Sequence, residues 1–221
     1  SDIKKYYMKR YDVAKTAARR EFETLSAFLS YCLDQDVIEF NPAFRLNLPK
    51  TAPRKHYVED YDVQEFIRHS HDLLDRYIPL KIYTGARKND LLSIKTIHWN
   101  GDGLYIGDRK SYRVLTGESK LGRIFQRTEA LEEIMDLVMS NAGSEWVFET
   151  QHKIPYIDLK TDKTEGFNSI WQRTKQRALA SGKMKQCFDP EKPHYIDVVE
   201  ARSLKIPLIF QERDLRAKTA T

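Results

Sequence analysis

The spacing of apolar residues along the chain predicts mostly helices. From about residue 13 to residue 34, apolar side chains recur at steps of three and four, as they do on one face of a helix. A shorter helical piece follows and ends at Asn41-Pro42, because proline stops a helix. The same period predicts a helix through residues 63–74, one that starts at Thr128 and one over residues 167–180.

A sharp corner between two helices is the most informative stretch. An apolar run through Ile82 leads into Gly85, the residue that most readily takes a positive φ and ends a helix. A second helix starts at once, with Asp90 in its first turn. Arg87 is therefore expected at a helix N-terminus, where its guanidinium and free backbone N–H groups make an anion site. A helix–turn–helix with a surface arginine fits these residues equally well.

The period changes after residue 100, which predicts a small β-structure. Residues 104–106 follow a turn at Asp102-Gly103, and residues 123–125 form a second apolar stretch. We expect a β-hairpin or a three-stranded meander here. Residues 183–207 contain three prolines and no clean period, so we expect a long excursion there. The whole pattern predicts a mainly α fold with a small β-hairpin or sheet, in the α+β class.

The balance of charge points weakly to a polyanionic partner. The chain has 37 lysines and arginines against 32 aspartates and glutamates, which gives a net charge of +5. Basic residues crowd the first twenty positions, and more of them flank the extended stretch from Leu48 to His56. We expect contacts to DNA phosphates from the N-terminal segment, the linker and the arginine corner, namely from Lys15, Arg19, Arg20, Arg54, Lys55 and Lys88.

Other classes of protein fit the sequence poorly. No apolar run approaches the length of a transmembrane helix, and the N-terminus lacks the apolar core of a signal peptide. The two cysteines, Cys32 and Cys187, match no metal-binding spacing, and no cluster of acidic or histidine residues has the spacing of metal ligands. This argues against a metal-dependent nuclease. We expect a cytoplasmic protein without a metal ion or another cofactor.

Two short motifs resemble those of tyrosine recombinases, the phage-integrase family. Residues 84–92 (Thr-Gly-Ala-Arg-Lys-Asn-Asp-Leu-Leu) resemble the box around the family's first catalytic arginine. Residues 213–221 (Arg-Asp-Leu-Arg-Ala-Lys-Thr-Ala-Thr) resemble the second box, whose usual form is His-x-x-Arg. Residues 20–42 look like the end of the family's helical core-binding domain. The resemblance implies a partial core-binding domain over residues 1–50, a linker over 51–56, and a catalytic domain, incomplete at its C-terminus, over 57–221.

The resemblance implies a chemistry carried by cationic side chains. Arg87 and Arg216 match the two catalytic arginines, which oppose the negative charge that builds on a phosphodiester under attack. Arg213 stands where the family usually has histidine, so it can donate to a phosphate oxygen but cannot shuttle a proton near pH 7. The family also uses a lysine on a β-hairpin to protonate the leaving 5′ oxygen. Lys110 and Lys120 compete for that role, with Lys120 slightly favoured.

The implied function is site-specific DNA recombination of phage or mobile-element type, without a metal and through a 3′-phosphotyrosine on duplex DNA of the attachment-site kind. In the family the nucleophilic tyrosine follows the second arginine, whereas the last of the twelve tyrosines here is Tyr195. We therefore expect this chain alone to bind phosphate without cleaving DNA. The alternative is a helical DNA-binding regulator of the same fold that has lost catalysis. Whether the protein forms a homo-oligomer on DNA stays open.

Overall fold

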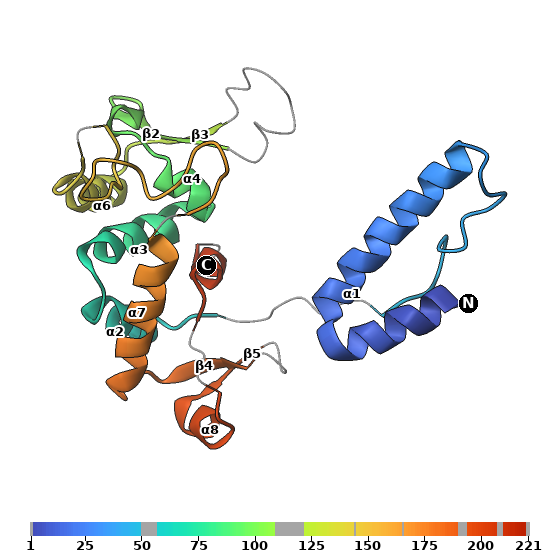
Figure 1. Cartoon of the computed structure of the whole chain (residues 1–221). Coiled ribbons are helices and arrows are strands. Elements are labelled where there is room, and N and C mark those ends of the chain that lie inside the picture. The colour runs from blue at the N-terminus through green and yellow to red at the C-terminus, as the bar shows by residue number, and fades with distance from the viewer. Residues whose placement is uncertain are drawn as a thin grey trace. The chain divides into compact units, whose positions relative to one another are not determined.

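The chain folds into two compact units, Ser1–Arg54 and Lys55–Thr221 (Figure 1). The computed structural model describes residues 2–49, 57–108, 122–143, 145–164, 166–189, 194–206 and 210–219. None of the helices within these ranges is both long enough and apolar enough to cross a membrane.

The first unit is built on α1 (Asp2–Asp34), whose backbone leaves the helical conformation at Ala14, with φ −152° and ψ 80°. The break lets the first arm fold back on the second. Tyr7 meets the ring of Phe22 edge-on, with ring centroids 5.7 Å apart, and Arg10 donates to both carboxylate oxygens of Glu21 at 3.0 Å. The spacing of apolar residues predicted no helix before residue 13. Tyr7 is the one buried residue of that arm of α1, and a single position cannot define a helical period.

The segment after α1 is not helical. Residues 35–41 form turns and bends, so the short helical piece expected to end at Asn41-Pro42 is wrong. The side-chain amide of Asn41 donates to the carbonyl of Ser26 at 3.1 Å and to the hydroxyl of Ser30 at 2.9 Å. These bonds fix the segment against α1 and take the place of a helical ladder. The buried core of this unit is small and consists of Tyr7, Ala18 and Leu48.

The second unit carries the larger core. Its helices are α2 (Asp60–Arg68), α3 (Asp72–Thr84), α4 (Lys88–Leu92), α6 (Glu129–Met139), α7 (Phe167–Ala180), α8 (Val198–Ser203) and α9 (Leu215–Lys218). The single helix predicted through residues 63–74 is wrong, because the chain turns at residues 69–71 and forms two helices. The strands β1 (Trp99–Asn100), β2 (Gly103–Gly107) and β3 (Gly122–Phe125) form an antiparallel sheet in that order. The three-stranded meander, the helix capped by Thr128 and the mainly α, α+β class are confirmed.

Residues 183–207 are more regular than expected. Strands β4 (Gln186–Asp189) and β5 (His194–Asp197) form an antiparallel hairpin, and α8 follows directly. The carboxylate of Asp62 in α2 accepts the backbone N–H groups of Lys185 at 2.8 Å and Gln186 at 3.1 Å, which ties the hairpin to the rest of the unit. Four-residue strands held by such distant contacts leave too little local pattern for a prediction.

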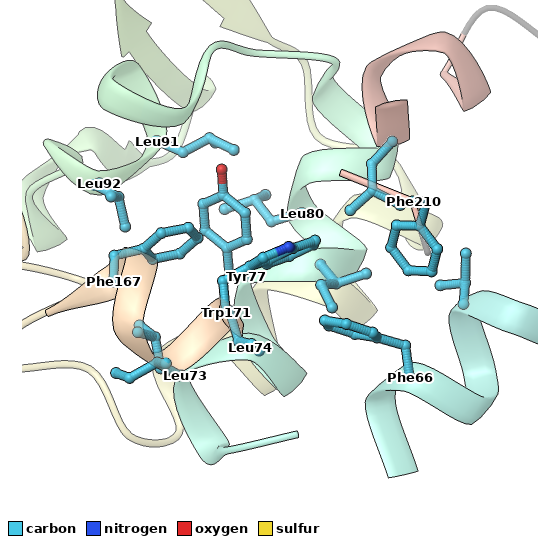
Figure 2. Close-up of a cluster of buried hydrophobic side chains, with 14 of the residues drawn as sticks. Phe66, Leu73, Leu74, Tyr77, Leu80, Leu91, Leu92, Phe167, Trp171 and Phe210 are labelled. Carbon is cyan, nitrogen blue, oxygen red and sulfur yellow. The ribbon is translucent and has the colours of Figure 1, made fainter. Parts of the chain in front are cut away.

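Aromatic side chains join the helices of the second unit (Figure 2). Phe66 of α2 lies 4.7 Å from Trp171 of α7 and 5.0 Å from Phe210, measured between ring centroids. Tyr77 of α3 lies 4.8 Å from Phe167 of α7. Because Phe210 stands just before the C-terminal arginine segment, this cluster fixes where that segment begins.

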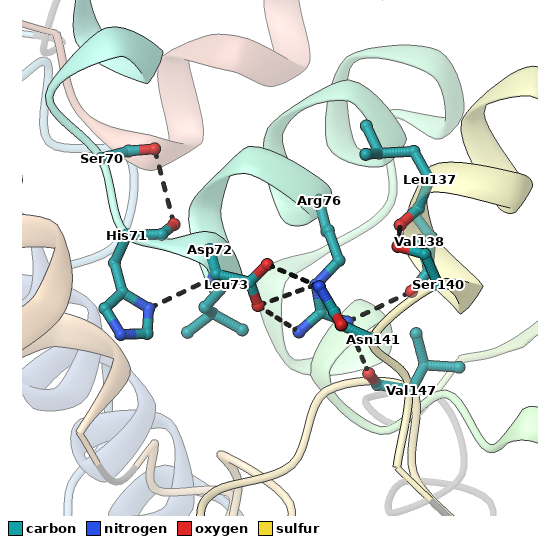
Figure 3. Close-up of polar contacts among 10 residues, drawn as sticks. All are labelled: Ser70, His71, Asp72, Leu73, Arg76, Leu137, Val138, Ser140, Asn141 and Val147. Atoms are coloured by element: carbon teal, nitrogen blue, oxygen red, sulfur yellow. Dashed lines mark hydrogen bonds and ion pairs between the residues drawn. The ribbon is translucent and has the colours of Figure 1, made fainter.

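Arg76 fastens α3 to neighbouring segments through several polar contacts (Figure 3). Its guanidinium is buried, pairs with Asp72 at 3.0 Å, and donates to the carbonyl oxygens of Val138 at 3.2 Å and Val147 at 3.3 Å. A planar fork of N–H donors can satisfy several acceptors at once, which suits a buried arginine. The bonds fasten α3 to the end of α6, so the corner that follows α3 is carried by a firmly anchored helix.

Candidate functional site

The corner after α3 has the predicted geometry. Gly85 ends the helix in the left-handed conformation, with φ 58°, and its N–H bonds to the carbonyl of Lys81 at 3.0 Å. Arg87 is the N-cap residue of α4. Because α4 has only five residues, the positive potential of the corner comes mainly from its side chains and not from a helix dipole.

Arg87 already has one anionic neighbour. Its Nη1 lies 2.7 Å from Oδ1 of Asp108, just after β2, and the two side chains are 41% and 34% exposed. A guanidinium carries five N–H donors, so this contact uses a minority of them. Arg87 is therefore oriented by a carboxylate and still reachable from solvent.

Lys88 faces α7. Its Nζ donates to Oδ1 of Asn168 at 3.0 Å and lies 3.5 Å from the hydroxyl of Thr164. Burial lowers the pKa of the Lys88 ammonium, while the Glu212 carboxylate acts in the opposite direction. The two neutral oxygens orient the ammonium without cancelling its charge.

The second arginine segment is a turn followed by a short helix. Arg213 lies in the 3₁₀ turn η2 (Glu212–Asp214) and Arg216 in α9, and both are exposed. The buried carboxylate of Asp214 accepts the N–H of Gln211 at 2.8 Å and the hydroxyl of Tyr195 at 3.2 Å. These bonds fix the turn that presents the two guanidiniums.

The two arginine segments lie side by side. The hydroxyl of Thr219, after α9, donates to the carbonyl of Ile82 at 2.6 Å. A cavity of about 270 Å³ is lined by Lys88 from the first segment, by Arg213 from the second and by Asn168 of α7. Residues more than 120 positions apart thus share one depression, lined by two cations and by the Glu212 carboxylate.

Gly85 tests this contact directly. A Cβ atom at Gly85 would lie 3.1 Å from the side chain of Thr219, on a backbone with positive φ. We expect Gly85→Ala to lower the free energy of unfolding by about 1–2 kcal/mol, measured in urea by tryptophan fluorescence. Gly101→Ala is the matched control, because nothing lies within 4 Å of its added Cβ, and it should change stability by less than about 0.5 kcal/mol. Equal losses in the two variants would contradict the close packing at Gly85.

The other predicted site residues lie in the first unit or outside the described residues. In the first unit, Lys15 lies over the ring of Tyr11 at 5.9 Å, Arg19 pairs with Glu23 at 2.7 Å, and Arg20 is exposed. Four further candidates, Arg54, Lys55, Lys110 and Lys120, lie outside the described residues. Across the described part of the chain, no three histidine, cysteine or acidic side chains gather as a metal ion would require.

Sequence reasoning missed three residues at the site, namely Lys81, Asp108 and Glu212. Lys81 is only 2% exposed although it is charged. Its position could have been noticed, because it lies four residues after the buried Tyr77 and so on the same face of α3. Nothing in the local sequence marks Asp108 or Glu212, since their partners are distant in the chain.

Solved integrase structures resemble the chain over nearly its whole length. A lambda integrase fragment (75–356), a dimer bound to a COC′ core site, matches 99% of this chain and 70% of its own, at 17% identity and a TM-score of 0.64. The lambda integrase tetramer bound to a Holliday junction matches 99% and 57%, at 16% identity and 0.62. The Tn1549 transposon integrase (aa 82–397) with circular intermediate DNA matches 99% and 70%, at 12% identity and 0.63.

Sequence comparison adds nothing to this, because no family model and no curated protein matches the chain. At such low identities the structural likeness establishes the fold and not the activity. The chain has the tyrosine-recombinase fold.

Proposed function

We propose that this chain is the DNA-binding and phosphate-activating part of a site-specific DNA recombinase of the phage or transposon type. The observation that carries the proposal is the packing of the two arginine segments against each other, through Thr219 on Ile82 and around the cavity of Lys88 and Arg213. Lys88 and Arg213, two cations from distant segments of a fold that other DNA integrases share, suit one anionic ligand, although Arg87 and Arg216 do not line this cavity.

The proposed reaction is transfer of a DNA phosphoryl group to tyrosine. The phenol gives up its proton to water, its oxygen attacks phosphorus, the bond from phosphorus to the 5′ oxygen breaks, and a 3′-phosphotyrosine forms. Arg87 and Arg216 oppose the negative charge on the phosphate oxygens, and Arg213 donates a further hydrogen bond. Lys120 or Lys110 supplies the proton that the leaving 5′ oxygen takes up. No metal ion takes part in the proposed reaction.

The proposed partner is duplex DNA, held by its phosphates. The solved neighbours are DNA-bound dimers and tetramers, which supports assembly of this protein on DNA as well. The basic N-terminal unit, with Lys15, Arg19 and Arg20, would add phosphate contacts from residues 1–50. Such binding weakens steeply as salt is added, because the protein displaces ions condensed on the DNA.

A regulator that binds DNA without cutting it is the second candidate. One observation favours it: arginine replaces the usual histidine at position 213. A guanidinium cannot act as a proton shuttle near neutral pH. The regulator would use the same depression to hold a phosphate and would not form a covalent bond.

Trapping on a nicked suicide duplex separates the two candidates. We expect the 221-residue chain to bind the duplex in a salt-dependent manner. The protein expressed from its whole gene should form an adduct that survives denaturing electrophoresis. Salt-dependent binding by that protein without an adduct would favour the regulator. Absence of binding at low salt would contradict both.

A further inference from the structure

Lys81 is a charged side chain in the core of the second unit. It stands in the last turn of α3 and is 2% exposed. Its Nζ donates to the carbonyl oxygen of Ala86 at 2.6 Å and lies 2.7 Å from Oε1 of Glu212. Ala86 is the residue before Arg87, and Glu212 is the residue before Arg213. One ammonium group therefore touches both arginine segments.

Glu212 has a second partner on the same helix. The hydroxyl of Tyr77, one turn before Lys81, donates to Oε1 of Glu212 at 2.6 Å. Burial raises the pKa of Tyr77 well above its ordinary value, and the Glu212 carboxylate raises it further, so the phenol stays a donor. The turn that carries Arg213 is thus fixed to α3 by two donors, one of them charged.

An ion pair at this position contributes less to stability than apolar packing between the two segments would. Taking an ammonium and a carboxylate out of water costs free energy, whereas burying two apolar side chains of similar size is favourable. Apolar packing is, however, nearly indifferent to direction, whereas a charge-assisted hydrogen bond fixes both distance and angle. The geometry of the pair, and not its contribution to stability, is what distinguishes it.

We infer that Lys81 and Glu212 are a positioning pair, which sets the placement of Arg87 relative to Arg213 so that both guanidiniums meet one phosphate. The inference rests on the proposed function in one respect, namely that the shared ligand is a phosphate of DNA. Neither side chain need touch the DNA. Lys81 acts through the backbone of Ala86, and Glu212 through the turn of η2.

The test compares this pair, whose side chains are 2% and 16% exposed, with a more exposed pair of the same chemistry. Lys81→Met removes the ammonium, and Glu212→Gln removes only the charge and keeps the shape. Lys95 and Glu145 also lie 2.7 Å apart, but their side chains are 36% and 59% exposed, so Lys95→Met and Glu145→Gln are matched controls. Circular dichroism and thermal unfolding first establish that each variant is folded at the temperature of the assay.

The functional readout is the coupling between Arg87→Ala and Arg213→Ala in the affinity for a short duplex. If both arginines hold one phosphate, the two single losses of affinity should not multiply. The loss in the double variant should be smaller than the product of the two single losses by about fivefold or more. In the Lys81→Met background we expect the losses to multiply, within about twofold. In the Lys95→Met background the coupling should stay as in the parent protein. A change in stability alone would not produce this pattern.

Two outcomes would overturn the inference. One is coupling that survives unchanged in folded Lys81→Met. If Lys81→Met does not fold, coupling that survives in folded Glu212→Gln has the same meaning. If neither arginine affects affinity, the proposed function is contradicted and NMR tests the positioning role instead. The Nε–Hε signals of Arg87 and Arg213 should then shift with Lys81→Met and not with Lys95→Met. Signals that do not move are the second outcome, and they refute the positioning role.

Discussion

Arg87→Ala is expected to slow covalent adduct formation by about 10²–10³-fold in the protein expressed from its whole gene. The reason is that Arg87 opposes charge that exists chiefly in the transition state, so its loss acts on the chemical step more than on binding. Single-turnover trapping on a nicked duplex, with protein in excess, measures that step. Arg87→Lys should recover only a small part of the rate, because an ammonium cannot donate in a planar fork.

Arg127→Ala is the control for this prediction. Arg127 is 43% exposed and pairs with Glu132 at 2.8 Å, much as Arg87 is 41% exposed and pairs with Asp108 at 2.7 Å. Loss of a half-exposed ion pair costs about 1 kcal/mol or less, so both variants should fold like the parent protein. A rate for Arg87→Ala that equals the rate for Arg127→Ala would remove Arg87 from the proposed reaction.

Phe66→Ala is expected to lower the free energy of unfolding by about 3–5 kcal/mol. Phe66 is fully buried between Trp171 and Phe210, and its truncation leaves a cavity that three different segments would have to fill. Urea unfolding followed by tryptophan fluorescence measures the loss. All three tryptophans of the chain lie in the second unit, so the signal reports on that unit.

Ile97→Ala serves as the control, because Ile97 is 73% exposed and its truncation should cost less than about 0.5 kcal/mol. A cost for Phe66→Ala below about 1 kcal/mol would mean that the aromatic cluster collapses around the missing ring. In that case the cluster could not be what fixes the start of the C-terminal arginine segment.

The parts of the fold that the sequence predicts best are those with a long local pattern. The helix over residues 167–180 occurs within the same bounds, because fourteen residues suffice to show a helical period. The corner at Gly85 is predicted because a glycine after an apolar run marks the end of a helix, where glycine readily takes a positive φ. The break of α1 at Ala14 is not, since alanine favours a helix and the contacts between the two arms, Tyr7 on Phe22 and Arg10 with Glu21, override that preference.

At the candidate site, sequence reasoning finds the cations and misses what holds them. Arg87 and Arg213 belong to motifs and are visible in a linear reading. Lys81 and Glu212 are not, because a charged residue is assigned to the surface unless a distant partner is known. The distance between positions 81 and 212 in the chain is what hides the pair.

The Lys81–Glu212 pair also restricts how the sequence can change over evolutionary time. A substitution at position 212 leaves the buried Lys81 ammonium without its carboxylate, which is more harmful than the loss of both charges, and one at position 81 leaves Glu212, which is 16% exposed, without its cation. Accepted changes should therefore occur at both positions together, toward two apolar residues or toward another complementary pair. In relatives of this protein, the identities at positions 81 and 212 should covary, and that covariation would mark the contact without any structure.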